Sequence, residues 1–417
     1  MHGSAMKSTG NLTPHSKKPS KIFSVETVKI VLKSGKDQPV KRFHPWIFSG
    51  AIKKIYGNPA DGDIVDVYDN KDTFLGTGHY QPGSIAVRIL SFEKVVPDKE
   101  FFKSKIASAI EYRRNLGFFS DHSTNAFRLV HAEGDNLPGL IADFYDGLVV
   151  LQMHSAGMFR MRNEITQAIL ELLPSEVRAV YDKSETTVPF KSGIVTVNEF
   201  LAGEAGTPVI KENGYRFRVD FAAGQKTGFF LDQRDNRMLL GKYSAGRKVL
   251  NLFGYTGGFS VYAMSNAELV HTVDSSGPAT DMADENVKLN YGDDERHKSF
   301  REDAFGFLEG CRDKYDLIIL DPPAFAKHND VLANALQGYK RLNMKAIENV
   351  RRGGVIFTFS CSQVVTRENF RKSVFAAAAN TGRKVRILHQ LSQPPDHPVN
   401  IYHPESEYLK GLVLYVD

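Results

Sequence analysis

The amino-acid sequence predicts an α/β protein with a doubly wound, mostly parallel sheet in its C-terminal half. From residue 209 onward, near-continuous apolar strands alternate with helical segments, the pattern of a parallel sheet covered by helices on both faces. Before residue 95 the pattern differs, because short strands follow one another with turn residues between them. The chain of 417 residues also exceeds the size that one hydrophobic core supports, so we expect two or three domains.

The first segment, residues 1–24, is predicted to be a disordered leader or tag. It mixes Gly, Ser, Thr, Pro, His and Lys and lacks the apolar central region of a secretory signal. Apolar runs such as 316–321 are far shorter than the roughly 20 residues that cross a bilayer, so no membrane partner is expected. The two cysteines, Cys311 and Cys361, have no metal-binding spacing, so we expect no metal site and a cytoplasmic location.

The net charge of +5 and the isoelectric point near 8.9 are compatible with a polyanionic partner. Many proteins without such a partner are equally basic, and most basic pairs in a sequence are solvated surface. Charge alone therefore does not decide whether the chain binds nucleic acid.

Residues 25–95 are predicted to form a small β-barrel. Turn sequences such as Asp61-Gly62-Asp63 and Pro82-Gly83 separate the expected strands, which are 28–32, 63–68, 74–80 and 85–92. Residues 96–204 are predicted to hold a linking helix and an α+β middle domain. Its expected elements are helices over 97–116 and near 158–173, strands over 127–131, 140–145 and 148–154, and two further strands.

Residues 205–417 are predicted to form the doubly wound domain, with strands over 249–253, 270–273, 317–321 and 355–360. The first of these strands runs into a turn that holds Gly254, Gly257 and Gly258, and a helical segment follows. Glycines allow a sharp turn and close approach of a ligand, and the start of a helix presents free N–H groups. A tight turn without a ligand remains an alternative, since the dinucleotide fingerprint GxGxxG is absent.

Two acidic residues favour a nucleoside ligand. Asp274 ends the next strand about 20 residues past the turn, where a carboxylate can accept hydrogen bonds from ribose hydroxyls. Asp303 precedes the strand at 317–321 and is expected to accept from an adenine amine. Each alone is more often a surface or capping residue, but their order after the glycine turn predicts a cofactor site.

The next two strands bring catalytic groups to the same edge of the sheet. Asp321 follows one strand with Pro322 and Pro323 behind it, and Cys361 follows the next. A thiolate that adds to carbon 6 of a pyrimidine makes carbon 5 nucleophilic, and a carboxylic acid can protonate the ring during addition. We therefore predict Cys361 as nucleophile and Asp321 as acid, and we expect a positive or helix-terminal environment to lower the pKa of Cys361. The base that removes the carbon 5 proton is not assigned.

At these residues the chain resembles the RlmI family of 23S ribosomal RNA cytosine-5 methyltransferases, over nearly all of its length after the leader. The stretches that carry the resemblance are Arg128–Val130, Gly134–Leu140, Gly224–Arg234, Asn251–Gly258, Asp321–Pro323, Ser360–Ser362, Asp396–Pro398 and Tyr408–Gly411. Many RNA cytosine methyltransferases carry a second cysteine where this chain has Pro323, so product release must proceed without it.

The resemblance implies a PUA RNA-binding domain at 25–95, the middle domain, and a Rossmann-like class I methyltransferase domain at 205–417 whose last strand is antiparallel. It implies S-adenosyl-L-methionine as cofactor and RNA, in particular 23S rRNA, as substrate and partner. The implied cofactor-binding residues are Gln225, Thr227, Phe253, Gly254, Tyr255, Gly257, Asp274 and Asp303. Substrate contacts are expected from Pro322, Pro323 and Phe325.

Three alternatives stay open from the residues alone. Single-cysteine uracil-5 methyltransferases share the chemistry expected of Cys361, and a base-nitrogen methyltransferase needs no covalent nucleophile. A non-catalytic RNA-binding assembly factor could also retain a cofactor fold. His44-Pro45-Trp46 could stack on RNA, although the single tryptophan is at least as easily a core residue. A homodimer is considered, but the sequence does not establish the oligomeric state.

Overall fold

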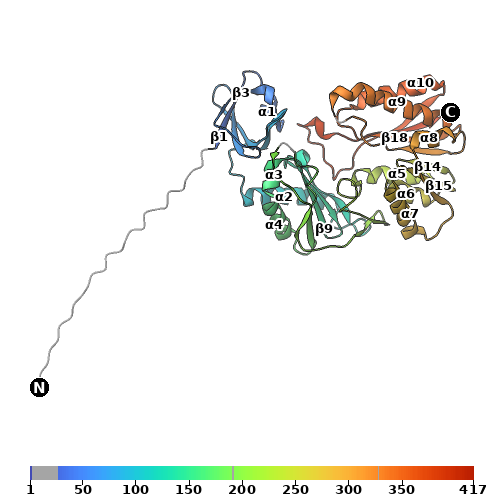
Figure 1. Ribbon diagram of the computed structural model, residues 1–417, viewed down its shortest axis with the longest axis horizontal. Helices are drawn as coiled ribbons and strands as arrows, with labels where there is room; N and C mark the ends of the chain where they lie inside the picture. The colour runs from blue at the N-terminus through green and yellow to red at the C-terminus, as the bar shows by residue number, and fades with distance from the viewer. Residues whose placement is uncertain (2–26, 190–191, 327) are drawn as a thin grey trace.

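The computed structural model describes Met1 and residues 27–189, 192–326 and 328–417 (Figure 1). The predicted leader at 1–24 lies outside these residues except for Met1. Within them the strands form three large sheets, which lie in separate regions of the molecule (Figure 1), and one two-stranded sheet. No helix in the described part is long and apolar enough to cross a membrane.

The N-terminal sheet has six strands in the order β2-β6-β5-β4-β1-β3. Its apolar side chains, among them Ile30, Val65 and Val87, are fully buried in one cluster. The four predicted strands are confirmed, but the sequence pattern did not reveal β2 and β3, which are short or largely polar. The elements are β1 (Val28–Leu32), α1 (Gln38–Lys41), β2 (Trp46–Phe48), η1 (Ser49–Ala51), β3 (Ile52–Tyr56), β4 (Ile64–Tyr68), β5 (Phe74–Tyr80) and β6 (Ile85–Ser91).

The middle sheet has five strands in the order β11-β10-β9-β8-β7, with α2 and α4 packed together beside it. Asp98 caps α2 by accepting from the Phe101 N–H. The helix predicted near 158–173 is broken at Met161, where the chain leaves helical geometry after burying Met158 and Phe159. The elements are α2 (Lys99–Asn115), β7 (Ala126–His131), η2 (Ala132–Asp135), β8 (Leu140–Tyr145), β9 (Leu148–Met153), α3 (Ala156–Arg160), α4 (Arg162–Leu172), β10 (Ala179–Asp182) and β11 (Glu199–Ala202).

The C-terminal sheet has seven strands in the order β16-β15-β14-β17-β18-β20-β19, preceded by the hairpin β12-β13. Strands β14 to β18 are parallel, whereas β20 runs antiparallel to both β18 and β19, which confirms the predicted doubly wound sheet with an antiparallel last strand. The first elements are β12 (Val209–Glu212), β13 (Tyr215–Arg218), η4 (Leu231–Gln233), α5 (Arg234–Tyr243), β14 (Lys248–Leu252), α6 (Gly258–Met264), β15 (Leu269–Asp274), α7 (Gly277–Tyr291), β16 (His297–Arg301) and α8 (Ala304–Glu309). The remaining elements are β17 (Leu317–Leu320), η5 (Asn329–Val331), α9 (Leu332–Asn349), β18 (Gly354–Ser360), α10 (Arg367–Thr381), β19 (Val385–Leu391), η6 (Pro404–Ser406) and β20 (Lys410–Val416).

Both faces of this sheet are buried. In β14, Val249 belongs to one apolar cluster and its neighbour Leu250 to another, as the alternation of side chains along a strand requires. Since β14, β15, β17 and β18 are parallel, their carboxyl ends lie at one edge of the sheet. The fold thereby brings the segments that follow these four strands together.

Candidate active site

A cavity of about 290 Å³ lies at the carboxyl edge of the C-terminal sheet. Its walls come from the turn after β14, the ends of β15, β17 and β18, and the segment 225–237. The residues around it are Gln225, Lys226, Phe229, Phe230, Asp232, Gln233, Arg237, Phe253, Gly254, Tyr255, Thr256, Gly258, Phe259, Asp274, Ser275, Ser276, Asp321, Pro322, Pro323, Cys361 and Leu409.

The turn after β14 has an unusual backbone. Phe253 and Tyr255 adopt positive φ angles of 57° and 46°, which are uncommon for residues other than glycine. A Cβ atom on Gly254 would lie 2.4 Å from Cγ2 of Thr272, so only glycine fits between this turn and β15. The turn therefore holds a fixed, strained shape against the cavity.

The carboxylate of Asp274 faces the same turn. One of its oxygens accepts from the Tyr255 N–H at 3.0 Å, and the other accepts from the Ser276 N–H at 2.9 Å. Each carboxylate oxygen can accept a further hydrogen bond, so Asp274 retains capacity for ligand hydroxyls. As predicted from the sequence, Asp274 ends β15 and lies beside the glycine turn.

The segment that begins at Gly224 closes over the glycine turn. The Gln225 N–H donates to the Tyr255 hydroxyl at 2.9 Å, and that hydroxyl lies 3.2 Å from the Gly228 carbonyl. The ring centroids of Phe230 and Tyr255 are 5.0 Å apart. Tyr255 therefore fastens this segment to the turn, and Gln225 lines the cavity beside it.

Four of the predicted site residues do not line this cavity. The buried Thr227 hydroxyl donates to Asp143 at 2.6 Å, on the middle sheet. Gly257 lets α7 approach, since a Cβ on it would lie 2.9 Å from Cβ of Ala283. Asp303 is exposed and caps α8 by accepting from the Gly306 N–H, and the ring of Phe325 packs 4.6 Å from the ring of Tyr339. Their predicted contacts with ligands remain untested.

Asp321 lies deep in the cavity wall. Burial raises its pKa to about 7, and the nearby carboxylate of Asp232 adds to this effect. The Gln233 amide donates to Asp321 at 3.0 Å, and the Asn236 amide donates in turn to Gln233 at 2.6 Å. Near neutral pH this carboxyl group can therefore hold or release a proton in a fixed orientation.

Cys361 faces the same space from the end of β18. Its Sγ atom lies 3.9 Å from the carbonyl oxygen of Pro322. The predicted lowering of its pKa is wrong for this structure: burial raises the pKa of the thiol to about 11, and the neighbouring Asp321 reinforces the increase. Lys226 opposes it but does not outweigh the loss of solvation.

Comparison with known proteins identifies the family of this chain. Residues 127–411 match the family model described as S-adenosylmethionine-dependent methyltransferase, and residues 30–92 match a PUA-like domain. Ribosomal RNA large subunit methyltransferase I of Alteromonas mediterranea is 40% identical over 397 residues, which are 94% of this chain and 99% of that protein. The protein of that name from Aeromonas salmonicida is 41% identical over 396 residues, or 93% of this chain and 99% of its own. The chain belongs to this methyltransferase family.

Solved structures agree with this assignment. A protein from Streptococcus mutans described as a SAM-dependent methyltransferase has a TM-score of 0.81 and 28% identity, over 93% of this chain and 100% of that one. A second solved structure, of a methyltransferase complexed with SAH, has a TM-score of 0.82 and 27% identity over the same shares. S-adenosylmethionine is accordingly the cofactor of this methyltransferase. The close backbone approach at Gly254 and the spare acceptor capacity of Asp274 both fit a nucleoside.

Sequence reasoning missed several residues around the cavity of the methyltransferase. Lys226, Asp232, Gln233 and Arg237 all line it, but none was assigned a role. Three of them lie in the stretch Gly224–Arg234, so this motif was the sequence signal that could have identified them. It does not show which of its side chains turn inward, because η4 and the positive φ of Lys226 decide that.

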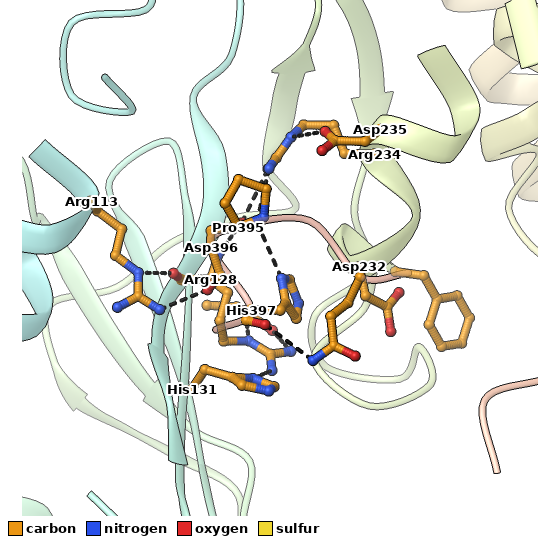
Figure 2. A network of polar contacts seen from close by, with 12 residues as sticks. Arg113, Arg128, His131, Asp232, Arg234, Asp235, Pro395, Asp396 and His397 are labelled. Atoms are coloured by element: carbon orange, nitrogen blue, oxygen red, sulfur yellow. Dashed lines mark hydrogen bonds and ion pairs between the residues drawn. The ribbon is translucent and has the colours of Figure 1, made fainter. Parts of the chain in front are cut away.

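A buried polar joint connects the methyltransferase sheet to the middle domain. Figure 2 shows Asp396 between Arg234 of α5 and Arg113 of α2. The Arg234 guanidinium donates to the Asp396 carboxylate at 2.8 and 3.1 Å, and Arg128 adds its backbone N–H at 2.9 Å. Arg113 donates to the Asp396 carbonyl at 2.7 Å. The joint thus fixes α5, which follows the cavity-lining Gln233, relative to the middle sheet.

Proposed function

We propose that this methyltransferase modifies carbon 5 of a cytosine in large-subunit ribosomal RNA through a covalent adduct with Cys361. The observation that carries the proposal is that Cys361 and Asp321 line the same cavity as Gly254 and Asp274. When bound, S-adenosylmethionine supplies an electrophilic methyl group. The chain's own task is to make carbon 5 of the base nucleophilic beside it.

In this proposal Cys361 and Asp321 share one proton. Asp321 takes the proton from the thiol, the sulfur adds to carbon 6 of the base, and Asp321 donates that same proton to the ring nitrogen. A pKa of about 7 suits Asp321 for holding this proton. After methylation a base removes the carbon 5 proton, the sulfur is expelled, and the ring nitrogen returns its proton to Asp321. That base stays unassigned.

The substrate class rests on the relatives, which are named for the large subunit of ribosomal RNA. We propose that residues 25–95 act as the PUA RNA-binding domain, 96–204 as the middle domain and 205–417 as the methyltransferase domain. Since Cys361 is only partly exposed at a cavity wall, a paired target base would have to leave its stack. A cytoplasmic location and a homodimer stay predictions.

Nucleoside analysis tests the proposal. The full chain is incubated with labelled S-adenosylmethionine and unmodified large-subunit rRNA, and the digested RNA is analysed by mass spectrometry. We expect labelled 5-methylcytidine, with wild-type yield from the control Cys311→Ser, because Cys311 is buried away from the cavity. Labelled 5-methyluridine or an N-methylated nucleoside would overturn the base assignment, and RNA binding without transfer would support an assembly factor.

A further inference from the structure

His44, His403 and Glu405 form a cluster between the N-terminal barrel and the C-terminal domain. His44 precedes β2, whereas His403 and Glu405 lie at η6 in the connection between β19 and β20. One nitrogen or oxygen atom from each residue lies within 4.8 Å of those of the other two. None of these three residues lines the cavity that holds Asp321 and Cys361.

His403 is the unusual member of the cluster. The residue is 1% exposed, and its Nε2 atom is buried without a hydrogen-bond partner among the described residues. That atom lies 3.7 Å from Oε2 of Glu405, which is too long for a hydrogen bond. A buried nitrogen without a partner costs stability, so a species that binds between His403 and Glu405 would satisfy it.

The geometry around the carboxylate suits a metal ion. Nε2 of His44 is hydrogen-bonded to the same Oε2 atom of Glu405 at 3.3 Å, so two imidazoles face one oxygen. Bonds of about 2.0–2.2 Å in a tetrahedral zinc site place neighbouring ligand atoms about 3.4 Å apart. The observed separations of 3.3 and 3.7 Å lie on either side of this value.

The other ring nitrogen of each histidine lies near an oxygen atom. Nδ1 of His403 lies 2.6 Å from the Ser406 hydroxyl, and Nδ1 of His44 lies 3.2 Å from both the backbone nitrogen and the carbonyl oxygen of Trp46. A metal-bound imidazole usually donates its second N–H to such an oxygen, which fixes the ring. In that tautomer Nε2 of His403 presents its lone pair toward Glu405. His44 reaches the same state when its proton moves from Nε2, where it serves the hydrogen bond to Glu405, to Nδ1, which lies 3.2 Å from the Trp46 carbonyl oxygen.

We propose that His44, His403 and Glu405 bind a divalent transition-metal ion, with Zn²⁺ as the best fit, which fastens the N-terminal barrel to the catalytic domain. Two imidazoles and one carboxylate are typical zinc ligands, whereas Mg²⁺ and Ca²⁺ prefer oxygen donors throughout. Water completes the coordination, because Glu405 is partly exposed.

The proposed site is also joined by a hydrogen bond to the segment that follows Cys361. The Glu405 carbonyl accepts from the Gln363 amide at 2.9 Å, two residues beyond Cys361. On the other side, Nε1 of Trp46 donates to Glu133 of the middle domain at 2.8 Å. The metal site therefore lies where all three domains meet. Its existence does not depend on the reaction proposed above.

Metal binding by the full chain tests the proposal. The protein is treated with a chelator and titrated with Zn²⁺ by calorimetry, and with Co²⁺ by visible absorption. We expect one saturable site per chain, with a Co²⁺ spectrum of low coordination number, and at least a 100-fold loss of affinity in His403→Ala. The control His122→Ala removes an exposed histidine elsewhere and should bind as the wild type does.

The absence of saturable binding by the wild type overturns the proposal without reference to any variant. Equal Zn²⁺ affinities of wild type and a folded His403→Ala protein would also overturn it. A second variant, Glu405→Gln, keeps the size of the side chain and should weaken binding in the same direction. Thermal unfolding gives an independent readout: Zn²⁺ should raise Tm in the wild type and not in His44→Ala, and an equal rise in both contradicts the site.

Discussion

Asp396→Asn should strongly destabilise the joint between the middle and catalytic domains. Asp396 is fully buried, and its carboxylate receives two charged hydrogen bonds from Arg234 and one from the Arg128 backbone. Hydrogen bonds to charged groups contribute roughly 1.5–3 kcal/mol each. Asparagine keeps the shape but presents an N–H to one of these donors and leaves the Arg234 charge uncompensated. We therefore expect a loss of about 3–5 kcal/mol in the free energy of unfolding.

Urea unfolding followed by circular dichroism measures this loss, with Glu368→Gln as control. Glu368 forms an exposed ion pair with Lys372, so its removal should leave the midpoint unchanged. Burial alone would raise the pKa of Asp396, but His397 and Arg234 outweigh it and hold that pKa well below its usual value. The stabilisation is therefore complete above about pH 4, the ordinary value for an aspartate, and is lost as pH falls below it. A loss under about 1 kcal/mol at pH 7 would refute the reasoning.

Three further predictions concern the cavity. Gly254→Ala should weaken S-adenosylmethionine binding about 10-fold or more, measured by calorimetry, because the new Cβ would lie 2.4 Å from Thr272; unchanged affinity would contradict the tight fit. Lys226→Met should slow alkylation of Cys361 by iodoacetamide at fixed pH, because Lys226 lowers the pKa of that thiol. An equal rate would show that Lys226 does not influence the thiol. The rate of methyl transfer should rise with pH and level off above about 7. Below the pKa of Asp321 both Asp321 and Cys361 hold a proton, so Asp321 cannot take the proton of the thiol. Asp321→Asn should abolish this rise, and a rise that persists would assign the titration to another group.

The edge of the catalytic sheet could be predicted from sequence because its signals are local. Apolar strands followed by Gly254, Asp274, Asp321 and Cys361 fix both the fold class and the side of the sheet where these residues meet. No long-range information is needed, since parallel strands place their carboxyl ends together.

The remaining features depend on contacts between distant parts of the chain. Thr227 and Lys226 are neighbours, yet the first turns toward the middle sheet and the second toward the cavity. The environment of Cys361 was mispredicted for the same reason, because burial depends on segments far from it in sequence. Trp46 neither fills the barrel core nor stands unpaired on the surface. Its indole N–H donates a hydrogen bond to Glu133 of the middle domain.

The central claim is that Cys361 forms a covalent bond with the target base, and trapping that adduct tests it most directly. In RNA that carries 5-fluorocytidine, fluorine replaces the proton that must leave carbon 5, so the adduct cannot resolve after methylation. We predict a complex of protein, RNA and one methyl group that survives denaturation, with the modified base attached to Cys361 in peptide mass spectra. Cys361→Ala should give no such complex. Methyl transfer to unmodified RNA by Cys361→Ala at the wild-type rate, or trapping on a different residue, would contradict the account.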